Sequence, residues 1–202
     1  MGADLAQRRG ITSRAIQHLE KALDMEYRDL PEVINLKKVR EDYTQLLTHY
    51  HQLAVALTAT EAEPPKNFVA KVVRAADRWR ALDPDSTQAC QLAAKALQAI
   101  GARDLAWDYL TTPIAQRPNE SAPWLDLARA IIESDFNLAD RAFGLAYKAE
   151  PTNAQILWDH AQALHQYGRF AQAQQLYRQL AEGDWQPRFQ NLREQARLKI
   201  QP

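Results

Sequence analysis

Histidines are the first residues in this chain that could do chemistry, and their spacing argues against a metal or catalytic site. The histidines of the chain are His18, His49, His51, His160 and His165. His49 and His51 are two residues apart in an expected helix, and His160 and His165 are five apart, so neither pair shares one helical face. A zinc site needs three or four ligands that converge on one point. We therefore expect surface histidines or residues of a binding groove.

Motifs for nucleophilic or phosphate chemistry are also missing. Cys90 is the only cysteine, so neither an intrachain disulfide nor a cysteine metal cluster can form. The sequence has no Gly-rich phosphate loop and no G-x-S-x-G nucleophile elbow. Acid pairs such as Asp83 with Asp85 stand at expected helix ends, where carboxylates cap the helix or favour its dipole. The sequence therefore predicts a protein that is not an enzyme and needs no cofactor or metal.

Charge and hydropathy exclude two further classes of partner. The 25 Lys and Arg residues balance the 25 Asp and Glu residues, whereas a nucleic-acid-binding protein needs a concentrated basic surface. No apolar run approaches the ~20 residues that span a bilayer, and the polar residues 1–9 lack the apolar core of a signal peptide. We expect neither nucleic acid nor membrane as a partner. The compartment stays open, with the cytoplasm slightly favoured.

The elements that must position these side chains are helices. Glycine is scarce, at 6 residues in the whole chain, and the dominant Ala, Leu, Gln, Arg and Glu are good helix formers. No segment alternates polar and apolar residues with the period of a strand. The predicted fold class is all-α.

A repeat of 33 to 34 residues runs through the second part of the chain. Pro84, Pro118 and Pro151 are 34 and then 33 residues apart. The same gaps separate the members of three further series: Cys90, Trp124 and Leu157; Ala106, Ala139 and Ala173; Leu110, Phe143 and Tyr177. One helix pair cannot bury its apolar face alone, so this repetition indicates a stack of pairs.

The register resembles the tetratricopeptide repeat (TPR), whose pattern runs W-x2-L-G-x2-Y, then A-x3-F, then P. Its best copy contains Trp124, Leu127, Ala128, Ile131, Ala139, Phe143, Ala146 and Pro151. Three copies cover residues 87–187. The resemblance implies a right-handed α-α superhelix, a TPR-like solenoid in which small residues bring paired helices close and large ones fill the gaps. Gly101 and Gly168 are expected to end first helices in the left-handed conformation.

Residues 1–86 form a divergent helical region. Six residues look like the turn and second helix of a partial copy: Gly10, Ala15, Ile16, Leu19, Ala22 and Leu23. Too few residues precede Gly10 for a first helix, so we expect a piece of a longer protein. A further helix is expected over 67–82, after the Pro64-Pro65 break.

A heptad stripe predicts one long helix over about residues 30–60, beginning near Pro31. Apolar residues step by three and four along it: Leu36, Val39, Tyr43, Leu46, Tyr50, Leu53 and Leu57. Leu47, Ala54 and Val55 widen the stripe, which favours packing inside the solenoid. Coiled-coil dimerisation is the alternative.

The C-terminal segment 188–200 is predicted to be a capping helix. Its inward residues are expected to be Phe189, Leu192, Ala196 and Ile200. Such a cap covers the last apolar face of a solenoid. We expect residues 1–86 and 87–202 to form one continuous solenoid.

The resemblance also implies where a partner would bind, because first helices line the concave surface in this family. Helical spacing puts three stripes there: Gln88, Gln91, Lys95 and Gln98; Ala122, Leu125, Arg129 and Ile132; Gln155, Trp158, Gln162 and His165. Trp158 is expected to face this groove. The alternative is a shift of one residue, with Trp158 in the core and Leu157 exposed.

We therefore expect a non-catalytic scaffold that binds a protein or peptide segment of partly acidic, partly apolar character, as a module of a larger, bacterial protein. Some TPR proteins clamp a C-terminal carboxylate with a Lys/Asn set, but only Lys95 and Arg129 are present here without the asparagines. One alternative is homo-oligomerisation through the heptad helix, a homodimer being possible but not favoured. Another is an accessory domain of a multidomain enzyme.

Overall fold

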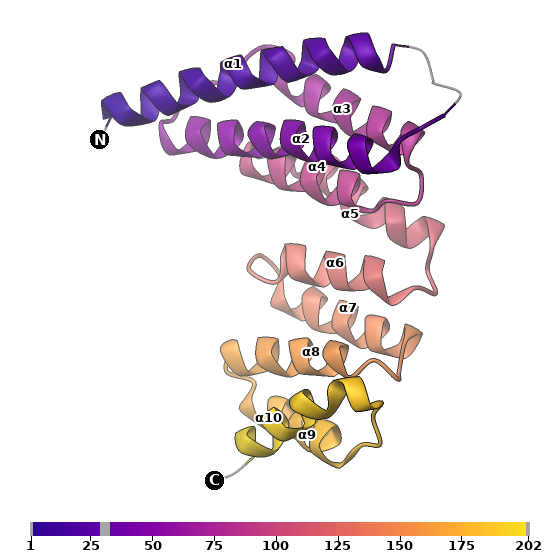
Figure 1. Cartoon of the computed structure of the whole chain (residues 1–202). Helices are drawn as coiled ribbons and strands as arrows, with labels where there is room; N and C mark the ends of the chain where they lie inside the picture. The colour runs from indigo at the N-terminus through magenta and orange to yellow at the C-terminus, as the bar shows by residue number, and fades with distance from the viewer. Residues whose placement is uncertain (1, 29–32, 201–202) are drawn as a thin grey trace. The chain divides into compact units, whose positions relative to one another are not determined.

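A computed structural model shows a chain of helices joined by short loops (Figure 1). The structure describes residues 2–28 and 33–200, with side chains from Arg9 onward. No strand occurs in the described part of the chain, so the all-α prediction is confirmed. The elements in chain order are α1 (Gly2–Glu26), α2 (Leu36–Ala59), α3 (Phe68–Leu82), α4 (Gln88–Ala99), α5 (Arg103–Gln116), α6 (Ser121–Ile131), α7 (Phe136–Ala149), α8 (Ala154–Gln166), α9 (Phe170–Glu182), the 3-10 turn η1 (Pro187–Phe189) and α10 (Gln190–Lys199).

The chain divides into two compact units, Met1–Thr112 and Pro113–Pro202. The division falls inside α5, where Pro113 lacks the N–H that a helix interior uses. It differs from the sequence boundary at 86/87, which marks where the regular repeat begins. The single continuous solenoid expected from the sequence stays a prediction.

The helix boundaries follow the repeat found in the sequence. First helices α4, α6 and α8 begin at residues 88, 121 and 154, and second helices α5, α7 and α9 begin at 103, 136 and 170. In the C-terminal unit α6 packs on α7, α7 on α8, and α8 on α9. Helices packed pairwise in sequence order at this period are the TPR-like arrangement, which confirms that prediction.

Left-handed glycines end two of the first helices, as expected. Gly101 follows α4 with φ of 81°, and Gly168 follows α8 with φ of 74°. A side chain at this backbone conformation is strained, so glycine permits the tight connection to the second helix.

The large residues of the repeat are buried between the helices to different extents. Phe143 and Tyr177 are buried. Trp124, expected at a core position, is only half-buried, and its indole N–H donates to the Pro118 carbonyl at 2.9 Å. Apolar burial on α6 comes instead from Leu127 and Ile131.

The heptad stripe of α2 is buried inside the N-terminal unit, as expected. The six stripe residues that step by three and four from Val39 to Leu57 are at most 5% exposed, as are Leu47 and Ala54, and α2 packs on α1, α3 and α4. Leu36 and Val55 were expected in the stripe but are 41% and 48% exposed, because they lie at the edge of the buried face. The helix begins later than expected, at Leu36, because the Asn35 side chain caps it by accepting from the Lys38 backbone N–H at 3.2 Å. The expected start at Pro31 lies outside the described residues.

The turn expected at Gly10 is absent, because α1 runs through it from Gly2 to Glu26. Glycine in a helix costs about 1 kcal/mol relative to alanine, which weakens a helix without ending it. Ile16 and Leu23 are the side chains of the expected partial copy that become buried.

The predicted C-terminal cap is confirmed. Helix α10 packs on α9 and α8, where Phe189 and Ala196 join the hydrophobic core and Leu192 and Ile200 pack against it. The last apolar face of the repeat stack is thereby covered.

A buried carboxylate ties α3 to α2 at the end of a repeat. Asp83 is 1% exposed. The Arg40 guanidinium donates to it twice, from Nε to Oδ2 at 2.7 Å and from Nη2 to Oδ1 at 3.1 Å. The Arg40 side chain remains 49% exposed. Water can therefore hydrate the Arg40 guanidinium if Asp83 is removed, but it reaches the Asp83 carboxylate poorly if Arg40 is removed.

This difference predicts unequal effects of the two alanine substitutions. Asp83→Ala should lower the free energy of unfolding by about 1–3 kcal/mol, because the freed guanidinium can be hydrated. Arg40→Ala should lower the urea midpoint further, because it leaves a buried carboxylate unpaired. Urea denaturation followed by circular dichroism measures both, with the 86% exposed Lys37 changed to Ala as control. A larger loss for Asp83→Ala than for Arg40→Ala would contradict this account.

Candidate partner-binding face

Helix α4 in the N-terminal unit exposes the stripe that the sequence predicts. Lys95 and Gln98 are exposed and Gln91 is half-buried, its amide donating to the Thr87 hydroxyl at 3.3 Å. The buried residues of α4 lie on the opposite face, among them Ala93 and Leu97. Three of the predicted site residues thus share one polar face.

Helix α6 in the C-terminal unit also presents its predicted stripe. Arg129 is exposed, and Leu125 and Ile132 are half-buried beside it. Helical spacing puts all three on the side away from Leu127 and Ile131, which face the core. This face therefore combines a cation with partly accessible apolar surface.

Trp158 does not face a groove, contrary to the sequence-based expectation. Its side chain is only 8% exposed and lies in the hydrophobic core, with its ring centroid 5.6 Å from that of Tyr177 on α9. The alternative with Leu157 exposed is also wrong, because Leu157 is 2% exposed. Both side chains are buried because α9 and α10 together cover a face of α8 wider than one helical stripe.

Asp159, which is half-buried, occupies the solvent-facing position that the sequence analysis gave to Trp158. Its carboxylate accepts from Arg129 Nη2 at 2.5 Å and from the Gln155 amide at 2.7 Å. Gln155, Asp159 and Gln162 step by four and three, which is also one helical stripe. The signal for it was present in the sequence, because Trp158 is flanked by apolar Leu157 and is more readily buried than a carboxylate.

The ion pair between Arg129 and Asp159 brings the outer faces of α6 and α8 together within the C-terminal unit. Gln162 is exposed next on α8. His165 is exposed at the end of the helix, with its ring centroid 5.1 Å from that of Phe170 on α9. We call the surface of Leu125, Arg129, Ile132, Asp159, Gln162 and Gln155 the α6–α8 face.

A shallow pocket of about 490 Å³ adjoins this face at the start of α8. Gln155 belongs to both, and Arg188, Phe189 and Glu150 line the other sides of the pocket. Hydrogen bonds from the Ser121 hydroxyl and the Asn153 amide lower the pKa of Glu150 and keep its carboxylate ionised. The Arg188 guanidinium lies 4.6 Å from the centroid of the Phe189 ring. A cation over an aromatic ring suits an acidic or apolar group from a partner.

Histidines are engaged in local contacts that need no metal. His160 Nε2 lies 2.6 Å from an Asp140 oxygen, and the His160 ring stacks on Phe143. His51 Nδ1 lies 3.2 Å from the Lys95 carbonyl. Within residues 2–28 and 33–200, no group of three or more His, Cys, Asp or Glu side chains could hold a metal ion. None of the described helices is long and apolar enough to cross a bilayer.

Comparison with known proteins gives similarity of structure only. No protein-family model and no curated protein sequence matches the chain. The solved structure of MamA 41-end from Desulfovibrio magneticus RS-1 is similar, with a TM-score of 0.44 and 16% identity over 86% of each chain. A structure of MamA AMB-1 has a TM-score of 0.39 and 16% identity, over 86% of this chain and 90% of that one. The helix pairs described above rest on this chain's own spacing and contacts.

The position of Trp158 predicts a structural role for its side chain. Trp158→Ala should lower the free energy of unfolding by about 3–5 kcal/mol, because it leaves a cavity in the core of the C-terminal unit. Gln162→Ala, one helical turn along on the exposed face, should change it by less than about 0.5 kcal/mol. Chemical denaturation of both variants measures the difference. Equal stability of the two would contradict the burial of Trp158.

Proposed function

We propose that the chain is a non-catalytic interaction scaffold and that its α6–α8 face binds a segment of a partner protein. The observation that carries the proposal is the Arg129–Asp159 ion pair, which joins an exposed cation on α6 to a half-buried carboxylate on the next first helix, α8. The Arg129 side chain is 55% exposed and that of Asp159 is 21% exposed. Such a pair contributes about 1 kcal/mol or less to stability, so an incoming carboxylate can displace Asp159 at little cost.

Chemistry along the face supports a partner segment with both acidic and apolar residues. Leu125 and Ile132 offer apolar surface that the core does not use completely. The amides of Gln155 and Gln162 can satisfy the backbone of an extended or helical peptide. Arg188 in the adjoining pocket supplies a second cation for an acidic residue. For the N-terminal unit, the polar face of α4 with Gln91, Lys95 and Gln98 stays a second predicted partner-binding surface.

Site-specific photo-cross-linking in cells that produce the protein tests the α6–α8 face. A photoreactive residue at Gln162 should give a discrete adduct with a partner, and the adduct should fade when Arg129→Ala is added. The same residue at Gln175, exposed on α9, serves as the matched control and should give none. Equal adducts from the two positions, or an adduct indifferent to Arg129→Ala, would count against the proposal.

The alternative hypothesis, a homodimer formed through the heptad stripe, can be tested because that stripe is buried within the unit. A dimer through Tyr43, Leu46 and Tyr50 would have to break the packing of α2 on α1, α3 and α4. We expect the monomer mass by multi-angle light scattering across a hundredfold range of protein concentration. A mass that doubles with concentration would support self-assembly instead.

A further inference from the structure

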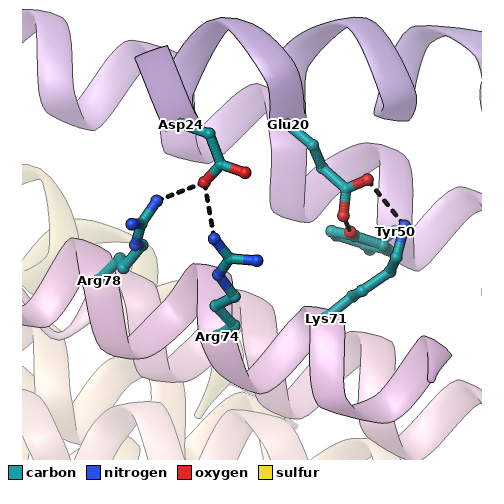
Figure 2. Close-up of polar contacts among 6 residues, drawn as sticks. All are labelled: Glu20, Asp24, Tyr50, Lys71, Arg74 and Arg78. Carbon is teal, nitrogen blue, oxygen red and sulfur yellow. Dashed lines mark hydrogen bonds and ion pairs between the residues drawn. The ribbon is translucent and has the colours of Figure 1, made fainter. Parts of the chain in front are cut away.

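Helix α1 is held on the N-terminal unit by charges. The Glu20 carboxylate accepts from Lys71 Nζ at 2.8 Å, and the Asp24 carboxylate accepts from Arg74 at 2.9 Å and from Arg78 (Figure 2). All these cations lie on α3, at least 50 residues along the chain from the acids they bind. Two carboxylates on one helix thus face three cations on another.

The spacing of the charges matches a helix laid against a helix. Glu20 and Asp24 are four residues apart, so they share one face of α1. Lys71, Arg74 and Arg78 step by three and four, so they share one face of α3. Any helix with two carboxylates at this spacing can make the same pairs.

Few apolar side chains of α1 take part in its packing on α2. Among its described side chains, only Ile16 and Leu23 are buried, while Ile11 is 54% and Met25 is 75% exposed. Its ion pairs are partly open to solvent, with side-chain exposures from 24% for Glu20 to 62% for Arg74. Exposed ion pairs contribute little and are screened by salt, so the contacts of α1 with α3 can be replaced at little cost.

The interface under α1 is also incompletely filled. A pocket of about 180 Å³ lies between α1, α2 and α3, and its apolar wall includes Leu23, Tyr43 and Leu46. The Tyr43 hydroxyl is buried and has no hydrogen-bond partner among the described residues. Burial raises the pKa of Tyr43 to about 12, so the hydroxyl stays protonated and can donate. Buried polar groups normally have partners, so this face can satisfy an acceptor that α1 does not provide.

We propose that the face formed by Tyr43, Leu46, Lys71, Arg74 and Arg78 is a binding surface for an acidic amphipathic helix of a partner protein, and that α1 is its displaceable intramolecular occupant. The partner helix carries two carboxylates four residues apart beside an apolar stripe. It competes with α1 for the same cations, so α1 acts as an autoinhibitory segment. This surface lies in the N-terminal unit and is independent of the α6–α8 face.

Peptide competition on the full chain tests the proposal. The probe is a fluorescein-labelled peptide of residues 9–26, which carries the acids of α1, and fluorescence anisotropy measures its affinity. The chain variant Glu20→Gln/Asp24→Asn weakens its own α1 and should bind the peptide at least tenfold more tightly than the unchanged chain. Adding Arg74→Glu/Arg78→Glu should reverse this gain. A peptide with Gln and Asn in place of the two acids should bind at least tenfold more weakly.

A matched control separates this effect from net charge. Glu61→Gln/Glu63→Gln removes the same two charges from exposed positions between α2 and α3 and should leave the peptide affinity unchanged. Equal peptide affinity for the Glu20→Gln/Asp24→Asn variant and for this control would overturn the proposal.

Hydrogen exchange shows whether α1 is displaceable. In the Glu20→Gln/Asp24→Asn variant, amides of α1 between Ile16 and Leu23 should exchange at least tenfold faster, while those of α2, α3 and α4 keep their protection. Loss of protection across all four helices would overturn the proposal, because α1 would then be an integral part of the unit. Unchanged protection of α1 would overturn it as well.

Discussion

Close approach of paired helices, set by alanines at fixed repeat positions, is the constraint on which the regular part of this structure depends. Six alanines of the repeat are at most 1% exposed: Ala94, Ala106, Ala128, Ala139, Ala161 and Ala173. A larger side chain at such a position would force the helices apart or into strained rotamers. Because each pair contributes the same small residues at the same places, the remaining side chains of each pair meet in the same register.

Dense packing on two sides of a first helix limits what it can offer a partner. Helix α8 buries Leu157 and Trp158 towards α9 and α10. Ile156 is buried on another side of the helix, and α8 also packs on α7. One narrow stripe with Gln155, Asp159 and Gln162 is left for solvent. Recognition on such a surface therefore depends on a few charges and amides, with the apolar contribution coming from half-buried neighbours such as Leu125.

The two ends of the chain are attached to their units by different forces. The turn η1 and helix α10 cover the C-terminal unit with buried apolar groups, Phe189 on η1 and Ala196 on α10. Helix α1 covers the N-terminal unit with the buried Ile16 and Leu23 and with the carboxylates of Glu20 and Asp24, which are set against cations. Salt screens exposed ion pairs, whereas the burial of apolar surface does not rely on charge. Salt should therefore weaken the attachment of α1 more than that of α10.

The amino-acid sequence by itself determined the helices from α2 onward, the 33 to 34 residue repeat, the left-handed Gly101 and Gly168, most of the buried stripe of α2 and the capping helix. These features follow from short-range periodicity and from the conformational preferences of single residues. Only the tertiary structure decided that Leu157 and Trp158 are both buried, since α9 and α10 together cover a face of α8 that is wider than one helical stripe. The sequence could not predict the ion pairs of α1 with α3, because residues 50 or more positions apart along the chain meet only when the helices between them have packed.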